Sequence, residues 1–139
     1  MNLNTTIYET ELHVRPDDID MFQHVHSSKY MDYVLAARYD QMERCYNNPM
    51  SSYLEKGLGW VITSCTMNFK RALKLGDCML AQTQLIFATD KMVRVQFYIK
   101  NKATGKLCCD GHFDYAMIHI ATGKAQTIPA WAMEKYTLT

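Results

Sequence analysis

Residues 18–30 read Asp18-Ile19-Asp20-Met21-Phe22-Gln23-His24-Val25-His26-Ser27-Ser28-Lys29-Tyr30. Two aspartates precede a Ser-Ser pair of the kind that begins a helix. The first backbone N–H groups of a helix have no partner inside the helix and are electropositive, so they attract anions and polarise carbonyl groups. A carboxylate next to such N–H groups predicts a site that acts on an activated carbonyl.

The residues around this stretch predict one long helix and five strands. From about residue 28 to residue 46 the apolar residues recur at helical spacing, and they cover much of the circumference, as is typical of a buried helix. Asn47-Asn48-Pro49 then ends the helix. Alternating or β-rich patterns predict strands at residues 7–15, 60–69, 78–88, 92–100 and 107–120.

This order of elements predicts an α+β fold, in which a mostly antiparallel five-stranded sheet wraps around one long central helix. No repeat, low-complexity tract or linker interrupts the chain, so we expect residues 1–139 to form a single domain. A single sheet of this kind leaves edge strands exposed. Pairing between copies covers such edges, so we expect a homo-oligomer.

Composition narrows the class of protein. The formal net charge of +1 gives no reason to expect a nucleic-acid or membrane-surface binder. The five cysteines contain no Cys-x-x-Cys spacing, and Cys108 is adjacent to Cys109, which predicts reduced thiols in a cytoplasmic protein rather than a disulfide framework. The sequence shows no signal peptide and no apolar run long enough for a membrane span.

The chain resembles the 4-hydroxybenzoyl-CoA thioesterase-like branch of the hotdog-fold acyl-CoA thioesterases. The likeness extends over roughly residues 8–130. The residues that carry it are Arg15, Asp18-Ile19-Asp20, His24-Val25-His26, Tyr30, Ala37-Arg38, residues 55–59, residues 69–77 and Ile128-Pro129.

This resemblance implies an enzyme that hydrolyses an acyl thioester to a free acid and CoA, without a metal or redox cofactor. It makes Asp20 the catalytic carboxylate, and it makes the backbone N–H near Ser27 the group that polarises the thioester carbonyl. It also implies a homodimer or homotetramer with active sites at the dimer interface. Family members often carry Gly where this chain has Gln23, and a glycine allows closer approach of the backbone to a ligand.

Several further residues are candidates for binding the acyl-CoA substrate. Those near the predicted helix start are Gln23, His24, His26 and Tyr30. Those whose positive charge suits the phosphates of CoA are Lys70, Arg71 and Lys91.

The residues alone leave the chemistry of the site open. Asp20 can attack the carbonyl directly or activate a water molecule, and short aspartates also cap turns, which is the favoured interpretation of Asp17 and Asp18. His24 and His26 lack a third metal ligand nearby. A Ser-His-Asp triad would need a nucleophile-elbow sequence, which is absent.

Two other functions remain as alternatives. The first is a non-catalytic acyl-CoA-binding protein of the same fold. Gln23, which stands where family members often carry glycine, is the reason for this alternative. The second is a hotdog-fold dehydratase, which needs a histidine with an acidic partner near the helix. The acyl group, and CoA versus acyl carrier protein, depend on pocket shape and are not predicted.

Overall fold

The structure is a computed structural model, and it describes residues 2–138. Two 3-10 helices, η1 (Pro16–Asp18) and η2 (Ser27–Lys29), precede the long helix α1 (Tyr30–Arg44). The remaining elements are β1 (Tyr8–His13), α2 (Met50–Leu54), β2 (Leu58–Phe69), β3 (Cys78–Ala88), β4 (Met92–Asn101), β5 (Leu107–His119), β6 (Ala125–Gln126) and α3 (Ala130–Lys135). The predicted helix and five strands end within two residues of their expected bounds, whereas α2, β6 and α3 were not predicted.

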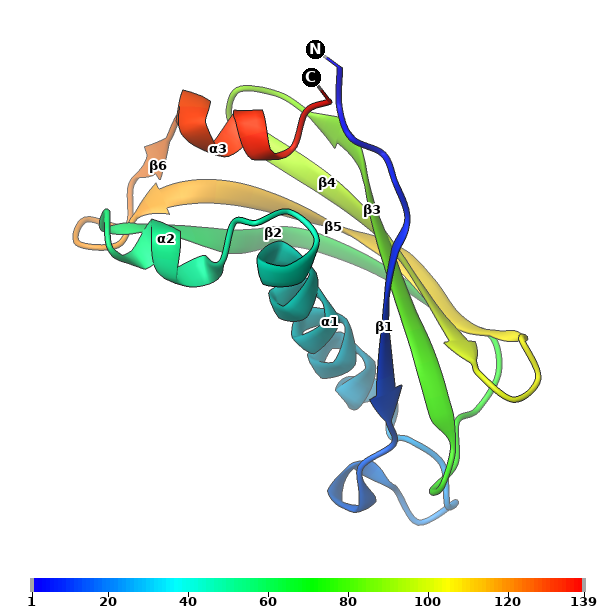
Figure 1. The fold of residues 1–139 in the computed structure, drawn as a ribbon. Helices are drawn as coiled ribbons and strands as arrows, with labels where there is room; N and C mark the ends of the chain where they lie inside the picture. The colour runs from blue at the N-terminus through cyan, green and yellow to red at the C-terminus, as the bar shows by residue number, and fades with distance from the viewer. Residues whose placement is uncertain (1, 139) are drawn as a thin grey trace.

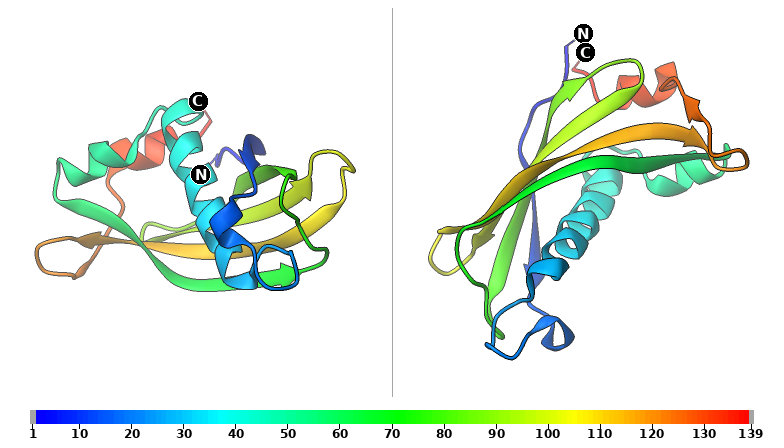
Figure 2. Two further views of the ribbon diagram at one scale, coloured as in Figure 1. Left: turned by 90° about the horizontal axis from the view of Figure 1, so that it is seen from below. Right: turned by 180° about the vertical axis from the view of Figure 1, so that it is seen from behind.

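The strands form one antiparallel sheet in the order β1-β3-β4-β5-β2, and the short β6 pairs with β5. Figure 1 and Figure 2 show this sheet curving around α1, which crosses its concave face. The predicted sheet wrapped around one helix is therefore confirmed. The two edges of the sheet are β1 and β2.

Alternation along the central strands builds the core. In β4 the side chains of Val93, Val95, Phe97 and Ile99 are buried, and the residues between them are only partly buried. Successive side chains of a strand point to opposite faces of a sheet, so this pattern turns one apolar face toward α1.

Helix α1 is buried on one face rather than all round. Tyr33, Val34 and Ala37 are buried against the sheet, whereas Ala36 and Tyr39 are exposed on the other side. The helix thus has more apolar side chains than a single chain buries. Some of its apolar surface stays exposed beside β2.

The first and last described residues of the chain lie together, at the far end of the molecule from the loop that precedes α1 (Figure 1). Leu3 and Thr137 form an antiparallel bridge there. All five cysteines are free. None of the helices in residues 2–138 combines the length and apolar character that a membrane span needs.

We predict that Gly111→Ala lowers the free energy of unfolding by about 3 kcal/mol, because the sheet has no room for a side chain there. A Cβ at Gly111 would lie 1.8 Å from the carbonyl oxygen of Thr66 and 2.9 Å from the Phe97 ring. Urea denaturation measures the loss. The matched control is Gly59→Ala, whose Cβ would meet only Ile120 at an ordinary 3.4 Å. Equal stabilities of the two variants would contradict the close packing of β2 on β5.

Candidate active site

The loop between β1 and α1 is fastened to the helix by a buried hydrogen bond. The Tyr33 hydroxyl donates to Asp18 Oδ2 at 2.6 Å and accepts from the Arg15 N–H at 3.0 Å. Asp18 is only 8% exposed, and its carbonyl accepts the N–H of His26 at 2.9 Å. Asp17 is exposed and pairs with Arg15 at 2.9 Å. Asp18 therefore has a structural role in holding the loop, whereas Asp17 forms only an exposed ion pair.

Asp20 lies half-buried at the turn of this loop. Its Oδ1 accepts the backbone N–H of Phe22 at 2.9 Å and that of His24 at 3.4 Å. Its backbone N–H donates to the His24 carbonyl at 2.8 Å. Within residues 2–138, Oδ2 has no hydrogen bond and the carboxylate has no ion pair. One oxygen thus orders the turn, and the other stays available to a ligand.

Gln23 adopts a backbone conformation that favours glycine. Its φ is 68°, in the left-handed region where a side chain is strained. The residue is exposed, and it does not line the cavity beside Asp20. The glycine that is usual at this position therefore suits the turn itself, and the glutamine side chain points outside the cavity.

A cavity of about 370 Å³ lies where the loop, the start of α1 and the end of β2 meet. It brings together seven of the nine predicted site residues, namely Asp20, His24, His26, Ser27, Tyr30, Lys70 and Arg71. Val25, Phe69 and Ala72 also line it and were not predicted as site residues. Phe69 could have been found from the sequence, because it directly precedes the basic pair on the inward face of its strand.

The helix start presents a free donor to this cavity. Residues of η2 run directly into α1. His26 caps this start, since its Nδ1 accepts the N–H of Ser28 at 3.2 Å and lies 2.7 Å from the Ser28 hydroxyl. The Ser27 N–H has no hydrogen-bond partner among residues 2–138. Such an N–H at the positive end of a helix is suited to an oxyanion or a polarised carbonyl.

Tyr30 and Phe69 form the apolar wall of the cavity. Their rings meet edge to face, with centroids 5.4 Å apart. Burial raises the pKa of Tyr30 to about 12, and the nearby Asp20 charge acts in the same direction. Tyr30 is therefore neutral near pH 7 and does not compete with Asp20 as a base.

Lys70 and Arg71 stand exposed at the rim of the cavity. Their backbone N–H groups donate to the Cys108 carbonyl at 2.7 and 3.1 Å, which fixes the chain at this point. Neither side chain is in an ion pair within the part of the chain described. Lys91 is not part of this cavity. It lies in the β3–β4 turn near α3, at the opposite end of the molecule (Figure 1).

The model of the thioesterase-like superfamily matches residues 14–136. The chain belongs to this superfamily. Across 127 residues it is 23% identical to the long-chain acyl-CoA thioesterase FadM of Escherichia coli (strain K12). The alignment covers 91% of this chain and 95% of that protein.

Solved structures of proteins named as thioesterases share the fold. The DHNA-CoA thioesterase from Staphylococcus aureus superposes with a TM-score of 0.87 at 19% identity, over 94% of this chain and 88% of that one. A 1,4-dihydroxy-2-naphthoyl-CoA thioesterase from Synechocystis has a TM-score of 0.83 at 14% identity, over 94% and 96% of the two chains. The expected hotdog fold is therefore confirmed.

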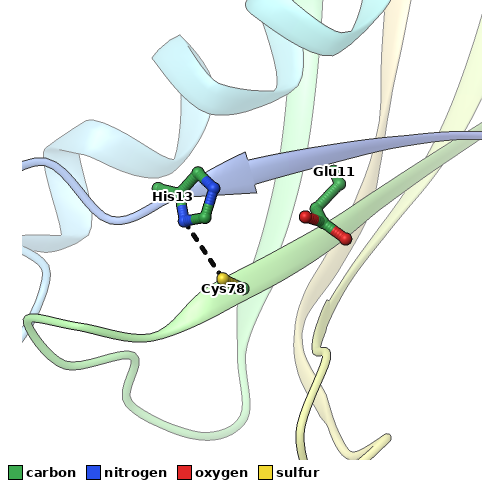
Figure 3. Close-up of side chains that lie close together, drawn as sticks. All are labelled: Glu11, His13 and Cys78. Carbon is green, nitrogen blue, oxygen red and sulfur yellow. Dashed lines mark hydrogen bonds between the residues drawn. The ribbon is translucent and has the colours of Figure 1, made fainter.

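One group of possible metal ligands lies outside the site. Glu11 and His13 of β1 and Cys78 of β3 place their ligand atoms within 4.8 Å of one another, and the thiol lies 3.0 Å from His13 Nδ1 (Figure 3). Lys102 Nζ pairs with Glu11 at 2.5 Å. Because this ammonium occupies the carboxylate and repels a cation, we assign no metal to the group.

We predict that Tyr33→Phe lowers the free energy of unfolding by about 2 kcal/mol, because it leaves the buried Asp18 carboxylate without its shortest hydrogen bond. Chemical denaturation measures the change. Tyr39→Phe is the matched control on the same helix, since Tyr39 is exposed and its hydroxyl has no hydrogen bond within residues 2–138. A Tyr33→Phe protein as stable as Tyr39→Phe would show that the loop is anchored elsewhere.

Proposed function

We propose that this protein hydrolyses acyl-CoA thioesters to a free acid and CoA. Membership of the thioesterase-like superfamily supports the reaction class, and the related E. coli protein is named a long-chain acyl-CoA thioesterase. The observation that carries the proposal is the meeting of the Asp20 carboxylate and the free Ser27 N–H in one cavity.

Thioester hydrolysis needs a nucleophile and a polarised carbonyl. The thiol that corresponds to the leaving thiolate has a pKa of about 8.5, so the thiolate departs without a strong general acid. In the proposed mechanism the Ser27 N–H donates to the thioester oxygen, and loss of one such donor typically lowers rates about 100- to 1,000-fold. In one route the unbonded oxygen of Asp20 attacks the carbonyl and expels the CoA thiolate, and water then hydrolyses the mixed anhydride on Asp20 to the free acid. In the other route Asp20 takes a proton from a water molecule that attacks the carbonyl, and the CoA thiolate leaves. No metal or redox cofactor takes part.

The other residues of the cavity indicate where each part of the substrate binds. Lys70 and Arg71 line the rim and form no ion pair among residues 2–138, so we place the phosphates of CoA against them. The apolar surface of Tyr30 and Phe69 receives the start of the acyl group. His24 and His26 border the reacting carbonyl. Gln23 and Lys91 lie outside this cavity, so we assign neither of them a part of the substrate.

We propose that two copies pair through β2. This edge strand runs for 12 residues, and most of its side chains are exposed. An unpaired edge of that length templates pairing with another chain. The other edge, β1, is shorter and is lined by the exposed Glu9, Glu11 and His13. Antiparallel pairing of two β2 strands about a two-fold axis brings the start of one strand beside the end of the other, so each cavity borders the partner.

We expect sedimentation equilibrium to give twice the mass of one chain, or four times if two dimers associate. The reason is the length of the bare β2 edge. The measurement is made over a range of protein concentrations in moderate salt. A single-chain mass throughout that range would contradict the proposal that the sites lie at an interface.

We also propose a cytoplasmic location. The free state of all five cysteines supports it, because reducing compartments keep thiols unpaired. The proposed partners are the acyl-CoA substrate and a second copy of the chain, with no nucleic acid or membrane among them.

We predict that Asp20→Asn lowers kcat/KM for acyl-CoA hydrolysis by at least about 100-fold, because the amide can neither attack nor accept a proton. The asparagine oxygen still accepts the Phe22 N–H, so the loop keeps its turn. Thiol release from a panel of acyl-CoA thioesters is the assay, and thermal melting checks the fold. Asp17→Asn is the matched control in the same loop, because its exposed pair with Arg15 contributes little.

Asp20→Asn turnover equal to that of the parent would remove Asp20 from the mechanism. Calorimetry with a non-hydrolysable acyl-CoA separates the alternative function. Tight binding by the parent protein without thiol release would favour a non-catalytic acyl-CoA-binding protein over an enzyme.

A further inference from the structure

A second cavity, of about 410 Å³, lies between the C-terminal half of α1 and the inner face of the sheet. It shares no residue with the cavity at Asp20. Its volume is in the range of small-molecule sites. Most of its wall is apolar, and the residues that matter here are Leu35, Arg38, Met42, Trp60, Val93 and Val95.

Arg38 is a buried cation in this wall. It is only 7% exposed. One of its five N–H donors, on Nη1, donates to the Thr83 hydroxyl at 3.3 Å, and the guanidinium also interacts with the Tyr46 hydroxyl. The guanidinium also lies 5.4 Å from the centre of the Tyr46 ring. No carboxylate among those residues forms an ion pair with it. A buried charge without a counter-ion is strongly unfavourable.

The neighbouring polar groups do not neutralise Arg38. The Thr83 hydroxyl donates to the Gln41 side-chain oxygen, and the Gln41 amide donates to Thr10 at 3.0 Å. Thr10 in turn donates to Asp40 at 2.6 Å. The carboxylate at the end of this chain is separated from the guanidinium by three uncharged side chains. The positive charge therefore faces the cavity.

Two further polar groups, on Trp60 and Tyr46, lie near the cavity or near Arg38. The Trp60 indole N–H is buried and has no hydrogen-bond partner in residues 2–138, whereas the Tyr46 hydroxyl interacts with the Arg38 guanidinium. Trp60 lines the cavity, and Tyr46 lies against Arg38. Buried donors are satisfied in most proteins, so the unused Trp60 donor in the cavity wall indicates a ligand that accepts a hydrogen bond.

We propose that this cavity binds an aliphatic carboxylate, with its carboxylate on Arg38 and its hydrocarbon chain along the apolar wall. A guanidinium binds a carboxylate through two parallel hydrogen bonds. The wall beyond Arg38 offers apolar contact to a chain and no second cation within the lining. An alcohol of equal length lacks the charge, and a cationic amphiphile is repelled.

The carboxylate has two sources. One is a free fatty acid, which binds here independently of catalysis. The other is an acyl thioester with a carboxylate at its far end, which rests on the proposed function and enters the cavity with its terminal group first. Both present the same chemistry to Arg38.

Fluorescence titration tests the site without any turnover. The chain has two tryptophans, so Trp131→Phe leaves Trp60 as a reporter inside the cavity. We expect decanoate to change Trp60 emission and to bind at least about tenfold more tightly than decanol, since a hydrogen bond to a charged group is worth more than 1.4 kcal/mol. Decyltrimethylammonium should bind more weakly than either. Equal binding of decanoate and decanol by this protein would overturn the proposal.

Arg38→Met in the same background removes the charge and keeps the bulk. We expect decanoate to lose its advantage over decanol in this variant. Arg44→Met is the matched control, because Arg44 lies on the same helix and pairs with Asp40 outside the cavity; it should keep the full advantage. Decanoate that still binds tenfold better than decanol to Arg38→Met would also overturn the proposal.

Thermal melting separates a binding role from a structural one. Without ligand, Arg38→Met should melt at or above the temperature of the parent, because it removes an unpaired buried charge. Decanoate should raise the melting temperature of the parent and leave that of Arg38→Met unchanged. A variant that melts well below the parent, with no stabilisation of the parent by decanoate, would make Arg38 structural and overturn the proposal.

Turnover identifies the source. Hydrolysis of a terminal-carboxyl acyl-CoA is compared with that of the plain acyl-CoA of equal length. A selective loss of the former in Arg38→Met supports the substrate source, and an unchanged ratio with loss of decanoate binding supports the free acid. Because decanoate binding needs no hydrolysis, its failure and the failure of the proposed thioesterase activity are distinguishable.

Discussion

The seating of one helix in one curved sheet is the constraint from which the other features follow. The buried face of α1 fixes the helix across the concave side of the sheet, and this also fixes where its first N–H groups point. The Tyr33 hydroxyl on this helix donates a 2.6 Å hydrogen bond to Asp18. This bond fixes the position of the loop relative to the helix. Asp20 follows two residues later. The relation between the carboxylate and the helix start is thus set by core packing rather than by the loop alone.

Periodicity in the sequence predicted most of this architecture. Strands with one buried face, such as β4, alternate visibly, so their existence and bounds were accessible. The loop with Asp20 was accessible because its residues carry a family signature. In contrast, α2 and α3 span only 5 and 6 residues, too few for a helical period to emerge from the pattern.

Other features of the site depend on distant contacts and could not be predicted. Gln23 appeared in the sequence as a side chain brought toward the ligand, but it is exposed and does not line the cavity. In the sequence, Lys91 and Lys70 are both cations next to a strand. Only the order of the strands in the sheet shows that the two lysines lie at opposite ends of the molecule. The burial of Arg38 was equally hidden, since an arginine inside an apolar helix pattern normally lies at the surface.

The proposed dimer connects the two cavities of the molecule. The Asp20 cavity lies by Phe69, at the end of β2, and the Arg38 cavity lies by Trp60, near its beginning. When two β2 strands pair antiparallel, the beginning of one strand faces the end of the other. The Arg38 cavity of each chain then lies near the Asp20 cavity of its partner. A long acyl group whose thioester lies at Asp20 of one chain would run toward the apolar cavity of the other, so that in the proposed dimer the two sites would act on one substrate.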